Sequence, residues 1–149
     1  MKTRIKIWIA STVLVAAVVV TVFLYVFRTR QPDMARLKTD YRIEATDLYS
    51  EFEADEQAAT GKFGGKIVEV SGSVETKERN EWGNVTITFI DPFNGVTCTI
   101  DSLQELKQPK IIGAVNEGDR ITVKGRCDGM LTDVKIVRCV ILPVTKNGE

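Results

Sequence analysis

The sequence predicts a mainly β protein: a small five-stranded closed barrel that follows an amphipathic helix and one N-terminal transmembrane helix. An uncharged apolar run comes first, helical periodicity follows, and most of the remaining chain alternates apolar with polar residues between turn sequences. We divide the chain into a basic tail (1–6), a membrane span (7–27), a spacer (28–44), a helix with the barrel domain (45–143) and a C-terminal tail (144–149).

The predicted membrane span extends from Ile7 to Phe27 and contains no charged residue, proline or glycine. As a helix rising ~1.5 Å per residue it is about 31 Å long, which matches a hydrocarbon core of roughly 30 Å. A cleaved secretory signal is the alternative, because Lys2, Arg4 and Lys6 precede the run. The length of the run, and its exit through aromatic and basic residues, favour an uncleaved anchor.

The orientation of the span is less strongly determined, because Lys and Arg flank it on both sides. The compact cluster of N-terminal charges favours a cytoplasmic tail. We therefore expect a single-pass protein of the inner membrane whose C-terminal domain is extracytoplasmic.

Composition excludes several kinds of function. Five of the 20 basic residues precede residue 31, so the rest of the chain has 15 basic and 20 acidic residues. Nucleic-acid binders usually carry a basic surface, and this acidic balance disfavours them. The chain has no histidine, the commonest general base and the usual zinc ligand, and its three cysteines form no CxxC pair. We expect no catalytic residue, no cofactor and no metal site, and hence no enzyme.

An amphipathic helix is predicted before the first strand. Thr46 or Ser50 can cap it, and Ser50 with Glu53 has the spacing of a capping box. Its apolar positions fall near one face: Leu48, Phe52, Ala59 and Phe63. Gly64 and Gly65 end the helix.

Alternating residues then predict five strands. Val68, Val70 and Val74 define one face of the first strand, and Gly72 marks a bend. Turns at 80–84 and 91–95 bound strands at 85–89 and 96–100. Residues 101–108 can form a short helix, and 110–115 an apolar connection to a turn at 117–119. Strands at 121–126 and 134–142 flank a hairpin turn at 128–133.

The predicted order is three strands, a linker and two more strands. The oligonucleotide/oligosaccharide-binding fold (OB-fold) has this order; it is a Greek-key barrel whose closure protects its strand edges. Further segments strengthen this interpretation: GKIVEVSGSV (65–74), VTCTI (96–100), EGDRITVKGRCDG (117–129), DVKIVRCVI (133–141) and the helical FEADEQAA (52–59). Together they resemble the tRNA_anti-like family of bacterial OB-fold proteins over residues 48–142. The resemblance implies nucleic-acid binding by analogy with anticodon-binding domains, although members often look like small envelope proteins of undefined function.

The outward face of the second and third predicted strands is expected to form a ligand surface. Stacking of bases requires aromatic side chains, and this face carries threonines instead. With two loop aromatics and two basic residues of the fourth strand, the candidate ligand face comprises Trp82, Thr86, Thr88, Phe93, Thr97, Thr99, Lys124 and Arg126. Packing of Trp82 and Phe93 over a barrel end is the alternative role for these two residues.

Cysteine pairing follows from the inferred fold, in which the third and fifth strands are parallel neighbours. Cys98 and Cys139 would then lie side by side and could form a disulfide in an oxidising compartment. Buried reduced thiols are the alternative. Cys127 lies near the hairpin turn and is poorly placed to pair with Cys139.

These observations favour a membrane-anchored, non-enzymatic OB-fold binding module of the bacterial cell envelope. Its expected partners are the lipid bilayer and an envelope protein, peptide or glycan. A nucleic-acid-binding OB-fold domain facing the cytoplasm and a structural subunit of a membrane complex are the alternatives.

Overall fold

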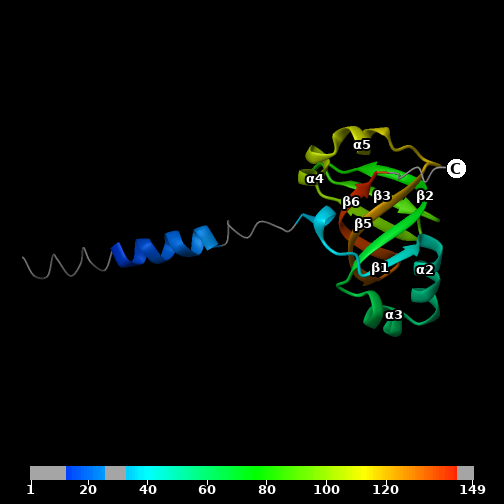
Figure 1. The fold of residues 1–149 in the computed structure, drawn as a ribbon, viewed down its shortest axis with the longest axis horizontal. Coiled ribbons are helices and arrows are strands. Elements are labelled where there is room, and N and C mark those ends of the chain that lie inside the picture. The colour runs from blue at the N-terminus through cyan, green and yellow to red at the C-terminus, as the bar shows by residue number, and fades with distance from the viewer. Residues whose placement is uncertain (1–12, 26–32, 144–149) are drawn as a thin grey trace, which may run out of the picture. The chain divides into compact units, whose positions relative to one another are not determined.

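The computed structural model describes residues 13–25 and 33–143 (Figure 1). The chain divides into two compact units, Met1–Pro32 and Asp33–Glu149. In the first unit, residues 13–25 form a helix. None of the helices within the described ranges has the length and hydropathy that a membrane crossing requires. Residues 7–12, 26 and 27 of the predicted span lie outside the described residues, as do both predicted tails, so the span stays a prediction.

The second unit is built on a closed barrel, which confirms the mainly β, five-stranded part of the predicted fold class. Its strands are β2 (Ile67–Arg79), β3 (Val85–Phe89), β4 (Val96–Ile100), β5 (Arg120–Met130) and β6 (Val134–Leu142). They follow the order β2-β3-β4-β6-β5, and pairing of β5 with β2 closes the ring. β4 and β6 run parallel, whereas the other neighbours in the ring are antiparallel. This arrangement is consistent with an OB-fold.

Alternating apolar residues of every barrel strand form one core. Val68, Ile87, Cys98, Val123 and Ile136 have no exposed surface. Strand β2 is long enough to pair with both β3 and β5, and its register with β3 shifts between Val74 and Thr76, close to the bend predicted at Gly72. A side chain at Gly72 would come within 3.0 Å of the Phe89 ring, so close packing of the core favours glycine there.

Two helices replace the single amphipathic helix that the sequence predicts. α2 (Ala45–Ala54) ends at Asp55, whose extended backbone interrupts the helix and whose carboxylate accepts a hydrogen bond from the Ala58 N–H at 2.9 Å. Asp55 thus caps α3 (Glu56–Phe63). The predicted capping box is wrong, because Ser50 lies inside α2 and donates to the Thr46 carbonyl. The predicted apolar face is correct: Leu48, Phe52, Ala59 and Phe63 are all buried in the barrel core.

Residues 33–44 of the predicted spacer form part of the domain, which corrects their assignment as a spacer. A 3₁₀ turn, η1 (Met34–Arg36), buries Met34, and a short strand, β1 (Tyr41–Glu44), pairs in parallel with β2. Segments of three and four residues are too short for their periodicity to be recognised in the sequence.

Between β4 and β5 the chain forms two short helices. α4 (Ser102–Lys107) confirms the predicted helix, whereas α5 (Pro109–Ala114) lies where an apolar connection was predicted. Pro109 at the first helical position favours this second start. Figure 1 shows α4 and α5 at one end of the barrel and α2 and α3 at the opposite end.

Candidate functional site

Four threonines form a polar strip on the outside of the barrel. Thr86 pairs with Thr99 and Thr88 with Thr97 across β3 and β4. Thr88 is buried and the other three are half-buried, while the residues between them on each strand face the core. We call Thr86, Thr88, Thr97 and Thr99 the threonine surface. The sequence correctly predicted which face of both strands it occupies.

The neighbouring strands extend this surface with residues that the sequence interpretation missed. On β2, Thr76 is opposite Thr88 and Glu78 is opposite Thr86. On β6, Lys135 is opposite Thr97. Glu78 and Lys135 are exposed and carry opposite charges, so the extended surface is rich in hydroxyls and close to neutral. Only the pairing of β4 with β6 reveals the position of Lys135, because this residue is far from Thr97 in the sequence.

Exposed apolar side chains lie at the ends of the threonine surface. Trp82 precedes β3 and is 79% exposed, whereas Phe93 follows β3 and is 77% exposed. Asn80 and Asp91 shape their loops by accepting the Trp82 and Phe93 N–H groups at 3.0 and 2.8 Å. Leu131, which the sequence interpretation missed, is 83% exposed in the β5–β6 loop. The alternative that Trp82 and Phe93 pack over a barrel end is therefore wrong.

Lys124 and Arg126 do not join the threonine surface. Both lie on β5, which pairs with β2 and β6 and forms the wall of the barrel across from β3 and β4. Lys124 is 5% exposed, and its Nζ donates to the Leu37 carbonyl and, at 3.5 Å, to the Ala35 carbonyl. Arg126 lies 3.7 Å from the Asp128 carboxylate. Lys124 therefore holds the segment before β1 against the barrel.

Glu69 is the acidic partner in this region. Its carboxylate accepts hydrogen bonds from the Thr39 hydroxyl and from Arg42 Nε at 2.6 Å, and Lys124 Nζ lies 3.8 Å away. Burial alone would raise the pKa of Glu69, but these hydrogen bonds and the charges of Arg42 and Lys124 hold it below its ordinary value. The network joins β1 and its preceding turn to β2 and β5.

The three cysteines are buried free thiols in the barrel core. Burial raises the pKa of Cys98 well above its ordinary value, and a hydrogen bond with Cys139 raises it further. Burial likewise raises the pKa of Cys127. The predicted neighbourhood of Cys98 and Cys139 is confirmed, whereas their disulfide stays a prediction. Within the residues that the structure describes, no group of three or more His, Cys, Asp and Glu side chains could hold a metal ion.

Comparison with known proteins identifies one family. The model of the tRNA_anti-like family matches residues 1–141. The crystal structure of a Klebsiella pneumoniae lipoprotein, provisionally described as nucleic acid-binding, is 17% identical, with a TM-score of 0.54 and coverage of 68% of this chain and 91% of that one. The S. pombe Stn1–Ten1 complex is 13% identical, with a TM-score of 0.41 and coverage of 51% and 57%. No curated protein matches the sequence.

Proposed function

The chain belongs to the tRNA_anti-like family, and from this premise we propose that it is an OB-fold binding module. We propose that its N-terminal span anchors this module in the bacterial cell envelope. The apolar run from Ile7 to Phe27 supports the anchor, and the family match includes this run. We place the domain outside the inner membrane. The absence of histidine from the sequence supports binding without catalysis.

We propose the threonine surface as the ligand-binding face, and the observation that carries this proposal is the pairing of Thr86 with Thr99 and of Thr88 with Thr97. Each hydroxyl can donate one hydrogen bond and accept two, so the surface suits a ligand with many hydroxyl or amide groups. The balanced charges of Glu78 and Lys135 favour a neutral ligand. A glycan or an extended peptide of the envelope has this chemistry, and β3 provides a track of about 17 Å at ~3.4 Å per residue.

The test measures binding of soluble cell-wall glycan oligomers and of neutral envelope peptides to the full chain in detergent. Thr86→Val and Thr99→Val together remove two hydroxyls while keeping the shape of both side chains. We expect at least about a tenfold loss of affinity, since two hydrogen bonds of about 1 kcal/mol each are lost. Thr60→Val, at an exposed threonine of α3, is the matched control. Full binding by the double variant would overturn the assignment of this face.

Single-stranded nucleic acid is the second candidate ligand, favoured by the family match and by the description of the Klebsiella lipoprotein. A nucleic-acid site would lose affinity steeply as salt rises, because bound phosphates release counterions. The neutral threonine surface predicts weak retention of single-stranded DNA or RNA with little salt dependence. Tight retention that falls steeply with salt would establish the second candidate instead.

The side of the membrane on which the domain lies can be tested without knowing the ligand. A reporter that is active only in the cytoplasm, fused after Glu149, should be inactive. An active fusion would place the domain in the cytoplasm and would remove envelope glycans and peptides as ligands.

A further inference from the structure

The α4–α5 segment exposes three large apolar side chains, while Ile112 of α5 is buried in the barrel core. Leu103 and Leu106 on α4 are 69% and 77% exposed, and Ile111 on α5 is 38% exposed. Trp82 belongs to the loop beside the start of α4, where the Asn84 side chain accepts the Ser102 N–H at 3.0 Å. We call Trp82, Leu103, Leu106 and Ile111 the apolar cap.

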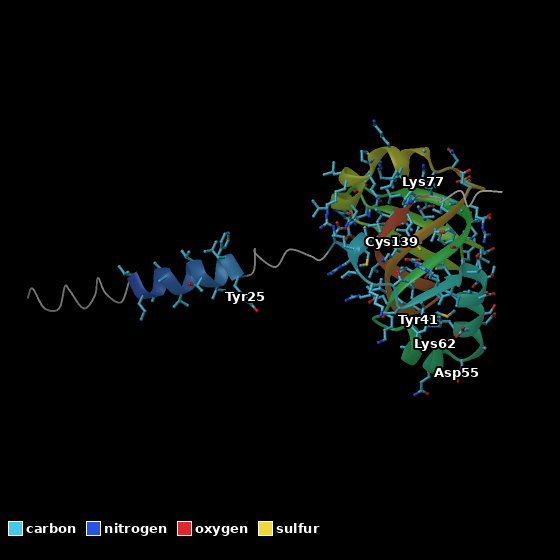
Figure 2. All side chains as sticks on the ribbon, viewed as in Figure 1. Tyr25, Tyr41, Asp55, Lys62, Lys77 and Cys139 are labelled. Carbon is cyan, nitrogen blue, oxygen red and sulfur yellow. The ribbon has the colours of Figure 1, made fainter. Side chains whose placement is uncertain are left out.

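Ile112 attaches α5 to the barrel core, whereas polar contacts hold the rest of this segment. Arg79 pairs with Glu105, and the Gln108 amide donates to the Ile141 carbonyl at 3.2 Å. Lys77 donates to the Val115 carbonyl, and Figure 2 shows this lysine on the α5 side of the barrel. α4 buries no residue at all. An ordinary surface helix turns its apolar side chains toward the core, so the two exposed leucines of α4 indicate an apolar partner.

The domain's N-terminal segment binds the barrel close to the apolar cap. Lys124, which donates to the Leu37 carbonyl, is paired with Val140 of β6. Gln108, at the junction of α4 and α5, binds the next residue of β6, Ile141. The turn through which the chain joins the domain is therefore attached to β5 beside Val140, and the α4–α5 segment is attached to the next residue of β6.

The number of residues between the span and the domain limits their separation. Five residues, 28–32, lie between Phe27 and Asp33, and a chain reaches at most about 3.6 Å per residue. If the span lies in lipid, the N-terminal segment of the domain stays within roughly 20 Å of the bilayer. The apolar cap, beside that segment, is then within reach of the lipid surface.

We propose that the apolar cap docks on the surface of the bilayer that holds the span, a proposal that rests on the membrane anchor proposed above. Trp82 lies at the headgroup layer, where amphipathic rings are favoured, and the two leucines enter the acyl boundary. Lys107 and Lys110 are exposed on the same segment and bind anionic headgroups. Docking restricts how the domain is oriented over the membrane.

The experiment uses the full chain with Trp8→Phe, so that Trp82 is its single tryptophan, in vesicles of phosphatidylethanolamine and phosphatidylglycerol. The same vesicles with brominated acyl chains should quench Trp82 fluorescence. Leu103→Glu with Leu106→Glu should abolish the quenching, since each buried leucine contributes about tenfold or more to the ratio of docked to undocked domain. Leu131→Glu, at an equally exposed leucine outside the apolar cap, is the matched control and should leave the quenching unchanged.

Flotation of the same vesicles separates the two proposals. A chain that floats with the vesicles but shows no quenching of Trp82 overturns the docking and leaves the anchor intact. Quenching that survives in the double glutamate variant also overturns the docking. A chain that stays in the aqueous fraction overturns the anchor and the docking together.

Discussion

Replacing Lys124 by methionine tests whether the segment before β1 is an integral part of the domain. Lys124 is 5% exposed, and its ammonium binds the Leu37 carbonyl and lies 3.8 Å from the Glu69 carboxylate. Methionine keeps the length of the side chain, so little cavity forms. A hydrogen bond to a charged group is worth about 1.5–3 kcal/mol, and removing a buried ammonium offsets part of that loss. We expect the free energy of unfolding to fall by about 2 kcal/mol.

Urea unfolding of the full chain in detergent, followed by far-ultraviolet circular dichroism, measures this loss. Lys135→Met is the matched control, because Lys135 is an exposed lysine on the neighbouring strand β6. Its effect should stay within about 0.5 kcal/mol. Amide hydrogen exchange in β1 should also accelerate in Lys124→Met, because that strand loses its attachment first. Equal stability of the two variants would refute the reasoning.

Three further predictions concern the packing and chemistry of the domain. The Glu69 carboxylate stabilises the fold at pH values above its unfolded pKa, and this stabilisation is lost as the pH falls through its lowered folded-state pKa. Glu69→Gln should therefore lower the free energy of unfolding at pH 7 but not in acid. A loss of stability that is constant with pH would contradict this. Gly125→Ala places a methyl group 2.6 Å from a β6 side chain. The free energy of unfolding, measured by urea titration, should fall by about 1–3 kcal/mol. An unchanged urea midpoint would contradict this prediction. If the domain is extracytoplasmic, Cys98 and Cys139 should form a disulfide. The mass of the purified chain should then rise by two hydrogen atoms on reduction. An unchanged mass would show that the thiols stay reduced.

Local sequence patterns predicted the strands well, because the alternation of side chains along a strand is a property of consecutive residues. In residues 96–100 the order Val-Thr-Cys-Thr-Ile already indicates which side chains face the core, and the structure buries Val96, Cys98 and Ile100. The break between α2 and α3 could not be predicted in the same way. Asp55 is an ordinary residue within a helical pattern, and it becomes a cap only because the chain turns there to place Phe63 in the core.

The candidate site shows the same division between local and long-range information. The outward direction of Thr86 and Thr99 is a local property that the sequence determined by itself, as are the apolar N-terminal run and the acidic balance of the remaining chain. The tertiary structure alone decided which residues lie beside them. Closure of the barrel brings Lys135 next to Thr97 and places Lys124 across from β3 and β4, because strand order and register depend on contacts between segments far apart in the chain.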